Sequence, residues 1–253
     1  MSKEIRQYKE TIIGIFDKIE AQSETIAKAA EVMADAIARD EVIHVVGTGG
    51  HSCMAAEELL WRAGGLAPIN AVLDAGVNLV HGAKRSNIIE RCEGYAKTLF
   101  ASYSMGEKPG EVIIIANAYG INAMTIDTAL EAKKRGMTVI AVTAKSFGDN
   151  VPPGAKARHS TNKNLYELAD IFVECSLPYG DAVVELEGMD QRVAPTSTFC
   201  NAFTVNCLVI ETVKALLARG ITPPVWISAN MPGGDEANKA LEQKYFGRIK
   251  HLK

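Results

Sequence analysis

Short apolar runs that alternate with helical patterns constrain the fold of this chain more than any other feature. The runs that read as buried strands are residues 42–46, 67–73, 111–116, 137–142 and 171–173. The helical patterns that follow them lie at 52–63, 86–104, 121–135 and 198–218. Strands separated by helices form βαβ units with a parallel sheet. The sequence therefore predicts an α/β fold, a three-layer αβα sandwich with a five-stranded parallel sheet of the flavodoxin- or Rossmann-like type.

Two more helices are expected ahead of the first strand, within residues 3–39. Their apolar residues recur at helical spacing, from Ile5 to Ile19 and from Ile26 to Ile37. No Pro-, Gly- or Ser-rich linker divides the 253 residues, a length at the upper end of one domain. We expect a single domain over 1–253, with N-terminal helices (1–39), an α/β core (40–220) and a C-terminal extension (221–253).

Composition argues against several classes of partner. A net charge of −3 does not favour nonspecific binding to nucleic acid or to anionic membranes. No apolar run approaches the ~20 residues of a membrane span, and the charged N-terminus does not have the pattern of a signal peptide. Five scattered cysteines without a C-x-x-C pair favour a reduced, cytoplasmic setting. We expect neither a nucleic-acid partner nor a membrane partner.

The run Gly-Thr-Gly-Gly-His-Ser at residues 47–52 directly follows the first strand. Ligands of open parallel sheets bind at the carboxyl ends of the strands. Glycine allows backbone N–H groups to approach a ligand closely, and the start of the next helix favours an anion. Thr48, His51 and Ser52 add side-chain donors. The pattern predicts an anion-binding loop.

Two other interpretations of this loop stay open. A dinucleotide-binding G-x-G-x-x-G would need glycine where Ser52 stands, although Asp74 lies where a ribose-binding acid belongs. A simple glycine turn without a ligand is the second. A Walker A loop is excluded, because no Gly-Lys-Ser/Thr follows the glycines.

Two further polar segments precede helices. Asn-Ala-Tyr-Gly-Ile-Asn at 117–122 follows the third strand, and Ser197 and Thr198 begin the long last helix. Helix capping alone would explain either segment. Because the first lies, like residues 47–52, at the carboxyl end of a strand, the two loops together favour a ligand site.

These three segments resemble the SIS (sugar isomerase) phosphosugar-binding domain family over roughly residues 20–220. Across the whole chain the sequence is similar to a SIS branch related to phosphoheptose isomerases. The resemblance implies a sugar-phosphate ligand and no cofactor. The phosphate-binding residues that it implies are Gly47, Thr48, Gly49, His51, Ser52, Asn117, Tyr119, Asn122, Ser197 and Thr198.

The second loop departs from the family pattern. That loop usually reads Ser-x-Ser-Gly-x-Ser/Thr, whereas Asn117, Tyr119 and Asn122 stand at the polar positions here. Amide groups can still hydrogen-bond a phosphate or a hydroxyl. We therefore expect the phosphate to depend more on residues 47–53 and on Ser197 and Thr198.

Acid–base residues are needed if the chain interconverts aldoses and ketoses. Glu58 matches, by resemblance, the Ala-Glu-Glu-Leu helix of phosphoheptose isomerases, although it lies closer to the glycines. His81, in the loop after the second strand, is the other candidate, and Glu187 is the next carboxylate in line. A solvated helical acid and a surface histidine remain the alternatives. The histidine of those enzymes' last helix has no counterpart in 198–218.

The expected function is that of an aldose–ketose sugar-phosphate isomerase. A non-catalytic sugar-phosphate sensor that acts through a partner protein stays open, as does an etherase or lyase on an N-acetylated sugar phosphate. No metal is expected, because His51 and Cys53 lack a second pair at ligand spacing. SIS domains commonly pair, so the resemblance implies a homodimer or a dimer of dimers. We expect the N-terminal helices to bury their apolar faces on the other subunit.

Overall fold

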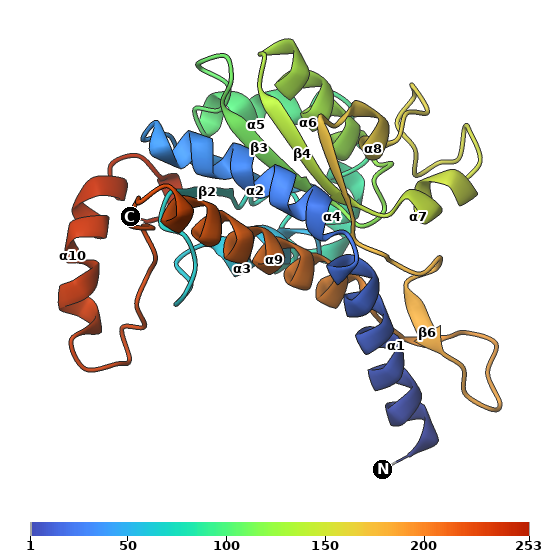
Figure 1. Cartoon of the computed structure of the whole chain (residues 1–253). Coiled ribbons are helices and arrows are strands. Elements are labelled where there is room, and N and C mark those ends of the chain that lie inside the picture. The colour runs from blue at the N-terminus through green and yellow to red at the C-terminus, as the bar shows by residue number, and fades with distance from the viewer. Residues whose placement is uncertain (1, 253) are drawn as a thin grey trace.

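A five-stranded parallel sheet lies at the centre of the computed structural model, which describes residues 2–252 (Figure 1). Its strands are β1 (Ile43–Gly47), β2 (Ile69–Val72), β3 (Val112–Ala116), β4 (Thr138–Thr143) and β5 (Ile171–Glu174). They lie in the order β2-β1-β3-β4-β5, and each neighbouring pair is parallel. The predicted three-layer architecture and its five-stranded sheet are confirmed.

Helices cover both faces of this sheet. One layer contains α1 (Lys3–Glu20), α2 (Ser23–Ala38), α3 (Cys53–Leu59) and α9 (Ser197–Ala218). The other contains α4 (Ala83–Ile89), α5 (Ala96–Ser102), α6 (Ala123–Lys134) and α8 (Leu165–Leu168). Successive strand residues face opposite layers, so Val45 packs with the first and Val46 with the second. All residues of β1, β2 and β3 are buried.

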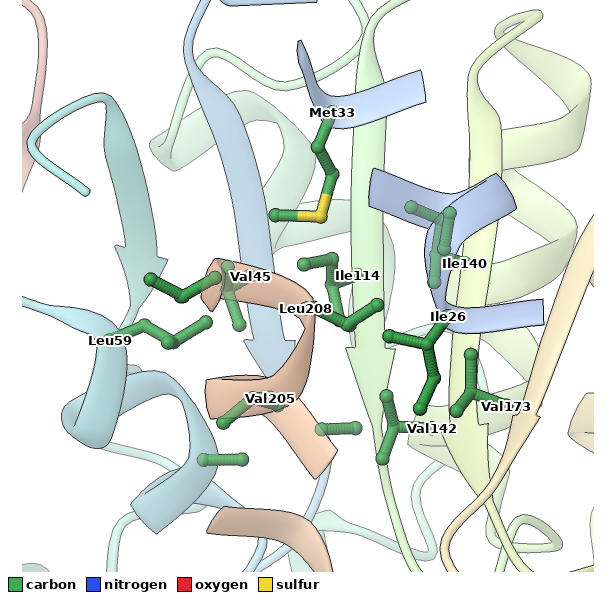
Figure 2. Close-up of a cluster of buried hydrophobic side chains, with 14 of the residues drawn as sticks. Ile26, Met33, Val45, Leu59, Ile114, Ile140, Val142, Val173, Val205 and Leu208 are labelled. Carbon is green, nitrogen blue, oxygen red and sulfur yellow. The ribbon is translucent and has the colours of Figure 1, made fainter. Parts of the chain in front are cut away.

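The helix α2 packs on its own sheet, which corrects the expectation that the N-terminal helices bury their apolar faces on another subunit. Ile26 and Met33 are 3 % and 0 % exposed. Figure 2 shows them among side chains of β3, β4 and α9. The expectation failed because α5 and α6 both lie on the opposite face, which leaves the area over β3 to β5 for α2. The helix α1 extends from the sheet toward the N-terminus beside the hairpin of residues 182–195, where the Tyr8 hydroxyl donates to the carbonyl oxygen of Pro195 at 2.6 Å (Figure 1).

The helix expected at 86–104 is divided into α4 and α5. The turn between them contains Gly94 at φ +86°, a conformation that glycine adopts readily. This turn ends α4 at Ile89 and places Glu90 at its C-cap. The break matters for function, because it brings the end of α4 to the carboxyl edge of the sheet.

The remaining elements lie at the periphery. A short 3₁₀ helix, η1 (Leu79–His81), follows β2, and α7 (Lys145–Asn150) follows β4. The strands β6 (Ala182–Val184) and β7 (Val193–Pro195) form an antiparallel hairpin ahead of α9. Beyond α9, α10 (Gly234–Tyr245) and η2 (Lys250–Leu252) complete the chain. Trp226, Tyr245 and Ile249 join them to the β2 side through a small apolar cluster of their own.

The helix α9 is long and apolar enough to cross a membrane by length and composition, and half of its most apolar window is buried in the fold. That burial is typical of a core helix. The other half of the helix carries exposed apolar side chains: Phe199, Ile210 and Leu217 are 44 %, 58 % and 59 % exposed.

Met33→Ala tests whether α2 belongs to the core of its own chain. Removing this fully buried side chain leaves a cavity, so we expect a loss of roughly 2–5 kcal/mol in the free energy of unfolding. Denaturant unfolding would measure it, with Ile88→Ala, at a 61 % exposed position, as the control with little effect. A loss that appears only at high protein concentration would place Met33 at a subunit interface instead.

Candidate functional site

A cavity of about 250 Å³ opens at the carboxyl ends of β1 and β3. Its walls come from the loops after these two strands, from η1 and α4, from the β6–β7 hairpin and from the start of α9. Parallel sheets bind ligands at this edge. The cavity brings together six of the residues expected from the sequence: His51, Ser52, Asn117, Tyr119, Ser197 and Thr198.

Close packing explains the glycines of the first loop. A Cβ on Gly47 would lie 2.1 Å from the carbonyl oxygen of Ser52, so this glycine makes the tight turn into α3. A Cβ on Gly49 would lie 2.9 Å from Glu90 Oε2 and 3.3 Å from Asn117 Nδ2. Gly49 therefore allows the loop to lie directly against two polar groups at the site.

Thr48 lies behind the cavity and not in its wall. The side chain is fully buried, and its hydroxyl is 2.6 Å from Thr125 Oγ1 on α6. The Thr48 carbonyl accepts a hydrogen bond of 3.1 Å from Asn117 Nδ2. Thr48 thus joins the first loop to α6 and to the second loop.

In the second loop, residues 117–122, side-chain amides form hydrogen bonds to the backbone. Asn117 Oδ1 accepts hydrogen bonds from the N–H groups of Tyr119 and Gly120, at 3.0 and 2.9 Å. The side chain of Asn122 lies outside the cavity lining, where its Nδ2 donates to the carbonyl oxygen of Ala157 at 3.2 Å. The N–H groups of Tyr119 and Gly120 and the side chain of Asn122 are therefore bonded within the protein.

Asp181 occupies the N-terminus of α9. Its carboxylate accepts hydrogen bonds from the N–H groups of Thr196 and Ser197, at 2.7 and 2.8 Å, and from the Ser197 hydroxyl at 2.9 Å. The hydroxyl of Tyr119 donates to it at 3.0 Å. An acidic group stabilises a helix N-terminus. The expected anion site at the start of α9 thus already holds a carboxylate of the chain itself, and sequence reasoning did not single out this residue.

Glu90 is the second site residue that sequence reasoning missed. Its carboxyl group lines the cavity beside the first loop. Burial raises the pKa of the Glu90 carboxyl, while Arg91 and a hydrogen bond from the Gly50 backbone act in the opposite direction. Asn87 Nδ2 donates to Glu90 Oε1 at 3.3 Å. The signal in the sequence was Gly94, which breaks the expected continuous helix.

The residues expected to carry catalysis lie outside the cavity lining. Glu58 accepts a hydrogen bond from Asn206 Nδ2 at 3.1 Å and pairs with Arg62 at 3.3 Å. His81 is exposed at the end of η1, two residues after Leu79, which does line the cavity. Glu187 is exposed in the turn of the β6–β7 hairpin. A single subunit therefore brings none of the three to the cavity wall.

The charge of the wall is negative. Glu90 and Asp181 are its ionisable acids, and no lysine or arginine of residues 2–252 lines it. Within the same described range, no group of three or more His, Cys, Asp or Glu side chains could hold a metal ion. The site as built by one chain can accept hydrogen bonds from hydroxyls and can exchange a proton through a carboxyl group.

Comparison with known proteins places this chain in a family. The SIS domain family matches residues 7–144, more than half of the chain. The chain belongs to the SIS domain family. A UPF0309 protein of Caldanaerobacter subterraneus subsp. tengcongensis is 39 % identical over 249 residues, which covers 97 % of this SIS chain and 98 % of that protein. A UPF0309 protein of Shouchella clausii is 33 % identical over 250 residues, covering 98 % and 99 %.

A solved structure shares the fold of this SIS chain. A phosphoheptose isomerase from Francisella tularensis has a TM-score of 0.53 at 21 % identity, and the match covers 85 % of this chain and all of that one. At this identity the likeness concerns the fold alone. The resemblance to the SIS family, with its phosphoheptose-isomerase relatives in fold, is confirmed.

Gly49→Val tests the role of the first loop. The branched side chain would collide with Glu90 and Asn117, so we expect ligand binding to be lost while most of the fold remains. Circular dichroism measures the fold, and calorimetric titration with sugar phosphates measures binding. Gly14→Val is a matched control, because no atom lies within 4 Å of a Cβ at Gly14. Normal binding by a folded Gly49→Val protein would make residues 47–52 a structural turn only.

Proposed function

We propose that this SIS domain binds a sugar phosphate in the cavity at the ends of β1 and β3. The observation that carries the proposal is the convergence of the two loops and the start of α9 on one polar cavity. A concave site with a few convergent polar groups is the usual form of a small-molecule site. Its hydrogen-bonding side chains suit the hydroxyl groups of a sugar.

The phosphate belongs, in this proposal, at the first loop. His51 is exposed at the cavity and Ser52 lines it, at the start of α3. Thr198 adds a hydroxyl at the rim. The N–H groups of Tyr119, Gly120 and Ser197 are bonded internally. The side chains named above and the backbone of residues 49–52 therefore carry more of the phosphate contact in this proposal.

The reaction that we propose is aldose–ketose isomerisation, which needs acid–base groups but no redox cofactor. A carboxyl group in the cavity wall with a raised pKa supports an enzyme over a non-catalytic sensor, because a sensor has no need of one. The etherase or lyase alternative would use the same carboxyl group as the general acid at a leaving oxygen, and no other group of the cavity wall favours it over isomerisation. A cytoplasmic setting remains part of the proposal, with five free cysteines in its favour.

Assembly as a homodimer, or a dimer of such dimers, is part of the same proposal. One side of α9 carries a stripe at alternating spacings of four and three residues, formed by Phe199, Phe203, Asn206, Ile210, Val213 and Leu217. Phe199, Ile210 and Leu217 are exposed, whereas Phe203 and Val213 are partly buried against the core of their own chain. Such spacing is typical of a seam between helices. We therefore propose that the exposed members of this α9 stripe meet a second copy of the chain.

The α9 stripe also connects to the residues expected for catalysis. Asn206, within the stripe, holds Glu58. The Thr198 hydroxyl, at the cavity rim, lies 3.6 Å from Met54 Sδ, and Met54 is 40 % exposed. A subunit packed on the stripe would cover Glu58 and approach the rim, which is where a neighbouring chain could add groups to the site.

Sugar phosphates should stabilise the protein, and the matching free sugars should not. At 100 times its dissociation constant a ligand adds about 2.7 kcal/mol, or roughly 5–10 °C in melting temperature for a chain of this length. A thermal-shift panel of pentose, hexose, heptose and amino-sugar phosphates, each beside its free sugar, makes the comparison. Equal shifts from a phosphate and its free sugar would contradict the proposal.

Ile210→Glu should dissociate the dimer. A charge at the centre of the α9 stripe has no partner in an apolar interface, while the residue is 58 % exposed within one chain and tolerates the change there. Light scattering would show the mass falling toward the 27.2 kDa of one chain. Ile88→Glu, at an equally exposed position on α4, is the matched control. A variant that keeps the wild-type mass would remove the stripe from the interface.

A further inference from the structure

Glu90 and Asp181 are the two acids of the cavity wall, and they differ in how fully the protein bonds them. Asp181 accepts hydrogen bonds from two backbone N–H groups and three hydroxyls. Among residues 2–252, the side chain of Glu90 has Asn87 Nδ2, at 3.3 Å, and the Gly50 backbone as its hydrogen-bond partners. Asp181 is therefore committed to holding α9, whereas Glu90 retains acceptor capacity toward the cavity.

From this arrangement we propose that Glu90 is the acid–base residue of the site, the group that moves a proton between neighbouring carbons of the bound sugar phosphate. The inference rests on the proposed function and deepens it. It also moves the role away from Glu58, whose carboxylate pairs with Asn206 and Arg62 outside the cavity lining.

The position of Glu90 along the cavity suits this role. A Cβ added to Gly49 would lie 2.9 Å from Glu90 Oε2 and 3.3 Å from Asn117 Nδ2. The carboxyl group thus lies at the junction of the first and second loops. A ligand that has its phosphate on the first loop and its hydroxyls on the second must therefore lie next to the Glu90 carboxyl group.

The backbone around Glu90 is held from several sides. The N–H of Met124 donates to the Glu90 carbonyl at 3.0 Å. The N–H of Gly94 donates to Asp127 Oδ2 at 2.5 Å, and Ser160 bonds the carboxylate of Glu93 through its N–H and its hydroxyl, at 2.7 and 3.0 Å. These contacts attach the turn after α4 to α6 and to the loop before α8. Catalysis depends on such fixed placement of the reacting group.

The chemistry balances without a co-reactant. The carboxylate of Glu90 takes the proton from the carbon next to the carbonyl, the C–H electron pair forms the C=C bond of an enediolate, and the carbonyl π pair moves onto oxygen. The hydroxyl proton on the deprotonated carbon then passes to the former carbonyl oxygen, and the O–H electron pair left behind forms the new C=O bond. The C=C pair takes the proton back from the Glu90 carboxyl at the former carbonyl carbon, so Glu90 ends as the carboxylate again. Burial raises the pKa of the Glu90 carboxyl, which makes it a stronger base for the first transfer and still leaves it able to return the proton.

The test compares Glu90→Gln with wild type, Glu58→Gln and Glu236→Gln, which changes an acid 73 % exposed on α10. Binding is measured by thermal shift with the sugar phosphates above, and proton transfer by NMR, as exchange of the C2 proton of the bound sugar phosphate in D₂O. We expect Glu90→Gln to retain binding within a few-fold and to lose exchange by at least 100-fold. Glu236→Gln should match wild type in both.

The pH dependence of stability separates a catalytic role from a structural one. The folded protein holds the Glu90 proton more tightly than the unfolded chain, so this group lowers the stability of wild type as the pH rises through the raised pKa. Glu90→Gln should therefore gain stability relative to wild type as the pH rises above the ordinary range of a glutamate carboxyl. A residue needed only to build the fold would instead destabilise the variant across the whole range.

The outcomes distinguish the two levels of the proposal. No stabilisation of wild type by any sugar phosphate would end the proposed function itself. Binding and full exchange in Glu90→Gln, with exchange lost in Glu58→Gln, would overturn the assignment of Glu90 and leave sugar-phosphate binding intact. Binding without exchange in wild type would also overturn it, since a sensor moves no proton.

Discussion

Burial of the parallel strands on both faces is the constraint on which the rest of this structure depends. Because β1, β2 and β3 are wholly buried, both layers of helices are needed to cover the sheet, and α2 is part of one of them. The faces of the sheet then leave little room for chemistry. Polar groups collect where the strands end, and the ligand site must form from the loops at that edge.

The sequence predicted this architecture well because each strand is a compact run of β-branched and other apolar residues bounded by glycine or polar residues. It was also sufficient for His51, Ser52, Asn117 and Tyr119, which come directly after strands and do line the cavity. Local pattern and topology decide where such residues lie. No distant contact is needed to bring them to the edge.

The remaining site residues depend on contacts that no local pattern shows. Thr48 resembles a ligand-binding residue in the sequence, yet it bonds Thr125, 77 residues away. Glu90 reaches the cavity only because the chain turns before Gly94 and α6 bonds its carbonyl. Asp181 itself has a left-handed backbone conformation, at φ +66°, just before the hairpin, and its carboxylate reaches the start of α9 from there. The side chains that set the charge of the cavity were therefore the ones that sequence reasoning could not place.

The side chain of Asn117 has a thermodynamic consequence. By accepting from the N–H groups of Tyr119 and Gly120, and donating to Thr48, it fixes the second loop before any ligand arrives. The conformational entropy of that loop is lost during folding and not at binding. Ligand binding therefore costs little conformational entropy at this wall of the cavity. The selectivity of the site is that of a rigid surface, set by shape and by the direction of its hydrogen bonds.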